Sequence, residues 1–582
     1  MYVASRPRWT APRLALFGLP AALGLLGVGV ALRAEEPTPA RATSLAGTER
    51  MLSEHFATSV VCAQCHSSAP QAKGLRDAKG RSVAPYDLWR TTLMANASRD
   101  PLWRAVLSTE IQATPSRAAD IQETCLRCHA PMASQEHRFA GAAPPTLADL
   151  SGTDTTAQLG LDGISCTVCH QIQPDNLGKP ESYSGNWVIK EGKQIFGPHP
   201  DPLTMPMRRH TGFTPTHGTQ VMQPALCGSC HTLFTDALLA DGSESGHRLP
   251  EQTPYLEWRN SDFTTEGELG KQAKTCQACH VPNVDADGVA IQTRIARNPM
   301  GGDFRIPERR PVGRHVFRGA NTLVLSILRD NQESLNPQAS PEEFQVAIDL
   351  ARENLREHSA TLQVSSAVRE DGELIATLAL KNLTGHKFPT AHPTRRAWLR
   401  VRVKDAAGKV LYAVGEHDAE GRLLGSDGKP LPAELVGGPV HAHQSALRTA
   451  DAPLVYEAVM GDPAGDPTYL LTRGATYIKD NRLLPQGWTS DHPDAQAILP
   501  QGVGDDPDHA AGGDQVRFVA PLGDAAGPLT IEATLLYQTL GARYAAELFE
   551  YDTAEVREFR AYYAKADKTP EVVAEASCEV PE

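Results

Sequence analysis

One pentapeptide pattern occurs five times in this 582-residue chain and constrains its fold more than any other feature. Each copy contains two cysteines separated by two residues, and a histidine directly follows the second cysteine. If the 11 Cys and 20 His were distributed at random, about 0.007 copies would be expected. The pattern therefore reflects a chemical requirement. Its copies, numbered one to five in chain order, occupy residues 62–66, 125–129, 166–170, 227–231 and 276–280.

This spacing suits the covalent attachment of haem. Two thiols three residues apart can form thioethers to the two vinyl groups of one haem, and the adjacent histidine can bind its iron. A disulfide framework leaves the histidine unexplained, and a zinc ribbon does not need one at this position. We therefore predict five covalent c-type haems, attached at Cys62, Cys65, Cys125, Cys128, Cys166, Cys169, Cys227, Cys230, Cys276 and Cys279. The predicted proximal iron ligands are His66, His129, His170, His231 and His280.

Residues 1–34 have the form of an export signal. Arg6, Arg8 and Arg13 precede an apolar run from Leu14 to Leu32. An uncleaved membrane anchor is the alternative, because ~19 apolar residues are just long enough to span a bilayer. Covalent c-type haem is assembled outside the cytoplasmic membrane, which agrees with export. We expect a periplasmic protein, with membrane-anchored or extracellular placement as the alternatives.

Composition restricts the partners. The chain has 56 Lys and Arg against 69 Asp and Glu, a net charge of −13. Such a surface repels phosphate backbones, so nucleic acid is not an expected partner. The expected partners are other redox proteins or a membrane electron-transfer complex, and assembly into a homo-oligomer stays open.

The distribution of cysteine divides the chain near residue 340. All five motifs precede residue 281, whereas residues 360–560 contain no cysteine. The predicted fold is multidomain, with a loop-and-helix multihaem domain followed by an all-β sandwich-like domain. The expected parts are a pentahaem domain over 50–330, a connecting helix over 340–358, a β-sandwich-like domain over 360–565 and a polar tail over 566–582.

Local patterns support the helix and the strands. Ser340, Pro341 and Glu343 match an N-cap, a first-turn proline and the third position of a capping box. Farther along, apolar residues alternate with polar or small ones over 374–380 and 399–403, which is typical of strands with one buried face.

Several segments beyond the five motifs resemble exported bacterial multihaem cytochromes c of the cytochrome c-554 and c-prime group. The resemblance covers most of residues 52–560 and implies electron transfer by a haem domain followed by a β-domain. One departure is Val281, which follows His280 where such proteins often have Met. The segments include Tyr86-Asp-Leu-Trp89, Met94-Ala-Asn-Ala-Ser-Arg-Asp100-Pro101, Cys128-His129-Ala-Pro-Met132, Asp162-Gly163-Ile-Ser-Cys166, Tyr255-Leu-Glu257-Trp258, Asn382-Leu-Thr-Gly385-His386 and Tyr477-Ile-Lys-Asp480.

Each haem that only transfers electrons usually needs a second axial ligand. His315 lies in a Gly-rich apolar stretch soon after the fifth motif and is the favoured candidate. For His386, the resemblance makes a role as haem ligand as well supported as a role as strand cap. His210 is a weaker candidate for a ligand. Met94 stands where related carriers often place a distal His and is therefore also a candidate ligand. Filling a gap in the core is the commoner role of methionine.

Two further features have ordinary explanations. The acidic run 505–509 could bind calcium, but a solvated loop is the preferred interpretation. Cys578 is the odd cysteine, so a free thiol and an intermolecular disulfide both remain open.

Two functions compete. The first is a pentahaem carrier that passes electrons between redox partners. The alternative is an oxidoreductase acting on a small nitrogen or sulfur compound at one five-coordinate haem. Ammonia-forming nitrite reductases commonly have Lys in place of the motif His at the active haem, whereas all five copies here end in His. The sequence therefore favours electron transfer without a dedicated catalytic centre.

Overall fold

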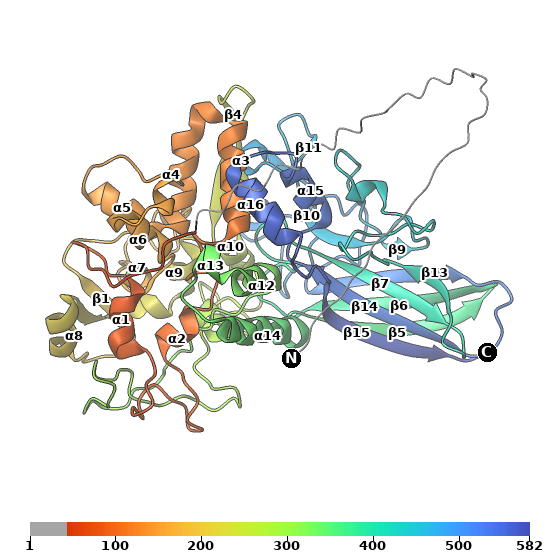
Figure 1. The fold of residues 1–582 in the computed structure, drawn as a ribbon. Helices are drawn as coiled ribbons and strands as arrows, with labels where there is room; N and C mark the ends of the chain where they lie inside the picture. The colour runs from red at the N-terminus through yellow and green to blue at the C-terminus, as the bar shows by residue number, and fades with distance from the viewer. Residues whose placement is uncertain (1–43) are drawn as a thin grey trace, which may run out of the picture. The chain divides into compact units, whose positions relative to one another are not determined.

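The haem-motif half of the chain consists of short helices joined by long loops (Figure 1). The computed structural model describes residues 44–582, so the predicted export signal lies outside the described residues. The helices of this half are α1 (Ser59–His66), α2 (Pro85–Trp89), α3 (Pro101–Ala113), α4 (Ala118–His129), α5 (Pro131–Phe139), α6 (Thr155–Leu161), α7 (Cys166–Cys169), α8 (Thr204–Thr211), α9 (Pro224–Gly228), α10 (Pro254–Arg259) and α11 (Cys276–His280).

Two small two-stranded sheets complete this half. Strands β1 (Gln194–Gly197) and β2 (Thr214–His217) pair in parallel, and β3 (Leu233–Leu238) and β4 (Glu244–Gln252) form an antiparallel pair. Five of the helices begin with proline at the first position, where the missing backbone N–H costs no helical hydrogen bond. The Asp100 carboxylate also caps α3 by accepting from the Leu102 N–H at 2.8 Å.

Helix α14 (Pro341–His358) links the two halves and follows α12 (Thr322–Asp330) and α13 (Gln332–Leu335). Its predicted capping box is present: the Ser340 hydroxyl accepts from the Glu343 N–H, and the Glu343 carboxylate accepts from the Ser340 N–H at 2.9 Å. Phe344 near its start packs in the core of the haem-motif half, whereas Leu355 near its end packs in the core of the β half.

The second half contains two facing sheets, as the sandwich-like prediction requires (Figure 1). One has the order β11-β10-β7-β14-β15, with β12 on β10 and β8 on β7; the other has the order β5-β6-β13-β9. The strands are β5 (Ala360–Glu370), β6 (Glu373–Asn382), β7 (Arg396–Lys404), β8 (Val410–Val414), β9 (Ala446–Leu447), β10 (Val455–Gly461), β11 (Pro467–Thr468), β12 (Thr476–Asp480), β13 (Gly513–Pro521), β14 (Leu529–Gln538) and β15 (Glu571–Val580).

Alternating side chains form the core between these sheets. In the central pair of the larger sheet Leu399 lies opposite Leu535 in an antiparallel register, and both are fully buried. Leu378 and Val516 occupy the same kind of position in the smaller sheet. The β half therefore owes its core to apolar residues that alternate along its strands.

The predicted polar tail over 566–582 is wrong. Most of it forms β15, which pairs with β14 from Leu529 to Tyr537 and places Cys578 opposite Ile531. Val573 and Val580 on this strand are only 1% and 4% exposed. Interspersed glutamates make the segment polar on average, but the two valines pack in the core between the two sheets.

The C-terminal helices also cross the predicted domain boundary. Helices α15 (Ala542–Leu548) and α16 (Ala554–Tyr563) belong by sequence to the β half, yet Val556 and Phe559 share a core with Leu107 of α3. The described residues consequently form one compact unit. Among residues 44–582, no helix is both long and apolar enough to span a bilayer.

Candidate haem-binding site

All ten motif cysteines and all five motif histidines line one continuous cavity of about 2300 Å³. This volume exceeds the ~300–1,000 Å³ typical of a pocket for one small ligand. Its walls are mainly apolar, and residues from α14 and from the loops at the edge of the β half contribute to them. The cavity is therefore large enough for several flat apolar groups that lie side by side.

Short helices position each motif at the cavity wall. The first and second motifs end α1 and α4, the third begins with α7, the fourth begins in the last two residues of α9, and the fifth forms α11. Positions three residues apart lie on one face of a helix, so the two thiols of a motif point the same way. The following histidine then extends from the end of that helix.

Four of the five motif imidazoles have the same orienting hydrogen bond. In each of them Nδ1 lies close to a backbone carbonyl oxygen. The distances are 3.0 Å from His66 to Ile295, 3.1 Å from His129 to Ala97, 2.6 Å from His170 to Phe196 and 2.7 Å from His280 to Arg318. A carbonyl oxygen only accepts, so Nδ1 carries the proton and Nε2 keeps its lone pair for a metal.

Burial also keeps these imidazoles in the neutral form that binds metals. It lowers the pKa of His129 to about 4 and that of His280 to about 4, outweighing the opposing hydrogen bonds to carbonyl oxygens. The pKa of His231 is likewise lowered, first by burial and then by the nearby Arg395 and His386. The donor set thus fits haem iron.

Two motif histidines face a second imidazole across a gap. The ring centroids of His170 and His315 are 6.2 Å apart with a 27° angle between the planes, and those of His280 and His386 are 6.5 Å apart at 22°. Metal–imidazole bonds of ~2.0–2.1 Å would put two such rings ~6 Å apart on opposite sides of one ion. The structure thus brings His315 to the third motif and His386 to the fifth.

Both partner rings have the same tautomer as the motif histidines. Nδ1 of His315 lies 3.0 Å from the Gly313 carbonyl, and Nδ1 of His386 lies 3.0 Å from that of Lys387. Burial lowers the pKa of His315 to about 4. Each ring pair therefore offers two Nε2 lone pairs, the donor atoms that an axial pair requires.

The other predicted ligands are placed less specifically. His210 is exposed at the end of α8, although it lines the cavity. Met94 also lines the cavity. Within the described part of the chain, no aromatic ring packs against that of His210. His210 is therefore not brought opposite a particular motif histidine as His315 and His386 are.

His392 is a cavity residue that was not among the ligands predicted from sequence. Burial lowers its pKa to about 3, with further contributions from Arg395 and the nearby His129 of the second motif. Its ring centroid lies 6.0 Å from that of Tyr544. The only sequence signal was a second histidine six residues after His386 in the same loop.

Cysteines of different motifs lie next to one another. A hydrogen bond with Cys166 and burial raise the pKa of Cys62. The thiols of the first and third motifs are therefore adjacent. The pKa of Cys128 in the second motif is raised in the same way by Cys230 of the fourth. The pKa of Cys227 in the fourth motif is raised in the same way by Cys276 of the fifth. Cys169 of the third motif also lies near both cysteines of the fourth.

The neighbouring motifs therefore have a definite order. The first, third and fourth form a row, and the second and fifth both lie beside the fourth. The imidazoles repeat three of these four adjacencies: His170 helps to lower the pKa of His66, and His231 helps to lower the pKa values of His129 and His280. Haems attached at these motifs would be neighbours in the same spatial order.

Comparisons with known proteins agree with this site. Residues 61–171, which contain the first three motifs in full, match the family described as cytochrome c554 and c-prime. A penta-haem cytochrome c552 from Thermochromatium tepidum has a similar fold, with a TM-score of 0.50 and 14% identity over 91% of this chain and 100% of that one. No curated protein matches the chain. The region of the first three motifs is thus similar to this family, and the chain shares its fold with the penta-haem cytochrome.

Proposed function

We propose that the chain is an exported pentahaem cytochrome that passes electrons between redox partners. The observation that carries this proposal is the order of the five motifs along one cavity. Haems attached at neighbouring motifs would lie close together, so that electrons could cross the molecule without leaving it. When bound, the haems supply the redox chemistry, and the protein supplies ligands, burial and charge.

The axial pairs support a carrier rather than a catalyst. His170 with His315, and His280 with His386, would occupy both axial positions of the third and fifth haems. An iron with two imidazole ligands has no coordination position left for a substrate. These two haems would therefore only accept and release electrons.

The fifth motif is the favoured point for exchange with a partner. Cys279 is exposed, whereas the other nine motif cysteines are partly buried. Among the other motifs, the motif cysteines place the fifth beside the fourth alone. The predicted export signal places this exchange in the periplasm or outside the cell, with a redox protein or a membrane complex as the partner.

A second candidate function is oxidoreduction of a small nitrogen or sulfur compound at the second motif. The Tyr544 hydroxyl is buried and has no hydrogen-bond partner, and its ring packs against that of His392. Burial, Glu251 and Glu110 all raise the pKa of Cys125, so two carboxylates also lie near this motif. Polar groups of this kind could bind a small substrate if the iron were five-coordinate.

Low-temperature EPR with a redox titration separates the two functions. We expect five haems per chain, low-spin signals in the oxidised protein, and no change on adding nitrite or hydroxylamine. One stoichiometric high-spin haem that shifts with either compound would overturn the carrier proposal. In that case Tyr544→Phe should alter the shift, whereas Tyr412→Phe, on the distant strand β8, should not.

A further inference from the structure

A cluster of two histidines and two aspartates is buried in the β half, outside the haem cavity. Asp514 lies at the start of β13, while His443, Asp506 and His509 come from two loops. Ligand atoms of His443, Asp506 and Asp514 lie within 4.8 Å of one another; His509 lies just outside this group, with its ring centroid 5.4 Å from that of His443. None of the four residues lines the haem cavity.

Two buried lone pairs in this cluster have no hydrogen-bond partner. Asp514 is 2% exposed, and its Oδ2 accepts from the Tyr456 hydroxyl at 2.7 Å, but its Oδ1 is unpaired. His509 is 7% exposed, and its Nε2 lies 3.0 Å from the Asn481 carbonyl oxygen. Because that carbonyl only accepts, Nε2 carries the proton and the unpaired Nδ1 keeps its lone pair. Buried acceptors of this kind are costly unless something binds them.

His443 has the opposite tautomer. The Asn481 amide is fixed because its Oδ1 accepts from the Glu457 N–H at 3.0 Å and its Nδ2 donates to the Val455 carbonyl at 2.9 Å. The same Nδ2 donates to Nδ1 of His443 at 3.0 Å, so Nε2 of His443 is protonated and donates to Asp506 at 2.9 Å. His443 therefore orients the Asp506 carboxylate and has no free lone pair of its own.

The charge of the cluster is not balanced by protein cations. The side chains of Asp506 and His443 are each only 3% exposed. In the described part of the chain, neither Asp506 nor Asp514 forms an ion pair with Lys or Arg. Two buried carboxylates this close together repel each other unless a cation or a proton lies between them.

We propose that Asp506 and Asp514, which have ligand oxygens within 4.8 Å of each other, bind one divalent transition-metal cation together with the unpaired Nδ1 of the neighbouring His509, and that His443 is a positioning residue. Two carboxylate oxygens and one imidazole nitrogen are ligands of the type that Zn²⁺ and Mn²⁺ accept, whereas Ca²⁺ prefers oxygen ligands throughout. The interpretation of 505–509 as a solvated loop then holds only for Asp505 and Asp508, which are exposed.

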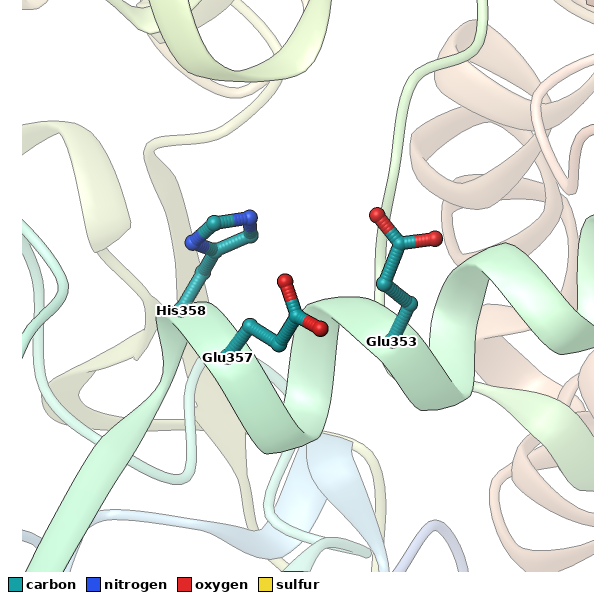
Figure 2. Close-up of side chains that lie close together, drawn as sticks. All are labelled: Glu353, Glu357 and His358. Carbon is teal, nitrogen blue, oxygen red and sulfur yellow. The ribbon is translucent and has the colours of Figure 1, made fainter. Parts of the chain in front are cut away.

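A second acidic cluster on α14 provides a matched comparison. Figure 2 shows Glu353, Glu357 and His358 side by side on the last turns of this helix. Their ligand atoms also lie within 4.8 Å of one another, but all three side chains are exposed. Water satisfies such groups, so we expect no tight binding there and use Glu357→Gln as the control variant.

The test uses the full haem-loaded chain, dialysed against a chelator and then incubated with zinc chloride alone. After gel filtration, zinc and iron are measured together by mass spectrometry. We expect one zinc per five haem irons in the unmodified chain and in Glu357→Gln, and none in His509→Gln or Asp514→Asn. Unchanged haem absorption spectra in the variants exclude loss of folding as the cause.

Titration calorimetry gives the second measurement. His443→Gln should retain the stoichiometry but weaken zinc binding by about 10–100-fold, because the partners that orient metal ligands typically contribute this much. Absence of zinc from the unmodified chain would overturn the proposal. Unaltered binding in both His509→Gln and Asp514→Asn would do the same, as would calcium binding as tight as that of zinc.

Discussion

Replacing His315 by alanine should change one haem of the five from low spin to high spin. The His315 ring lies 6.2 Å from that of His170, the separation that leaves room for one iron between two imidazoles. The alanine methyl group cannot reach across this gap. Because each motif attaches one haem, the low-spin signal should fall by about one fifth, and one high-spin signal should replace it.

The assay is low-temperature EPR of the oxidised protein, with spin quantified per haem. His247→Ala is a suitable control, because His247 is exposed on β4 and does not line the cavity. His386→Ala should produce an equal loss at a different haem. Since the two histidines face different motifs, the double variant should lose about two fifths of the low-spin signal.

Two results would refute this reasoning. A full low-spin signal in His315→Ala would show that the ring does not bind iron or that another side chain replaces it readily. A double variant with the same loss as either single variant would show that the two histidines do not serve separate haems.

Two further predictions concern stability. Burial alone would raise the pKa of Glu434, but Arg396 and His441 lower it from 4.5 to about 2. Their interaction should therefore stabilise the fold fully above about pH 4.5 and be lost as the pH falls towards 2. Glu434→Gln should cost about 3–5 kcal/mol at pH 7 in denaturant titrations, with a smaller difference from the unmodified chain at pH 3. Deleting residues 571–582 should leave β14 unpaired on one edge and remove two buried valines worth about 1.5–3 kcal/mol each; a shortened chain with unchanged thermal stability would contradict the assignment of β15.

Local sequence was enough wherever the determining contacts lie within a few residues. The haem motifs depend on the spacing of two thiols and one imidazole, and α14 depends on Ser340, Pro341 and Glu343. The alternation along β6 and β7 identified strands because one face of each is buried. All of these patterns can be recognised within a short stretch of consecutive residues.

The tertiary structure decided what depends on distant parts of the chain. Histidine is available at many positions, and only folding brings His315 to the third motif and His386 to the fifth. The sequence of β15 is polar on average and did not predict a strand. Which of its faces is buried depends on its pairing with β14. Likewise, Asp506 belongs to a loop with exposed neighbours, and its burial beside Asp514 results from packing between that loop and β13. Such contacts follow from chain topology, which local periodicity does not encode.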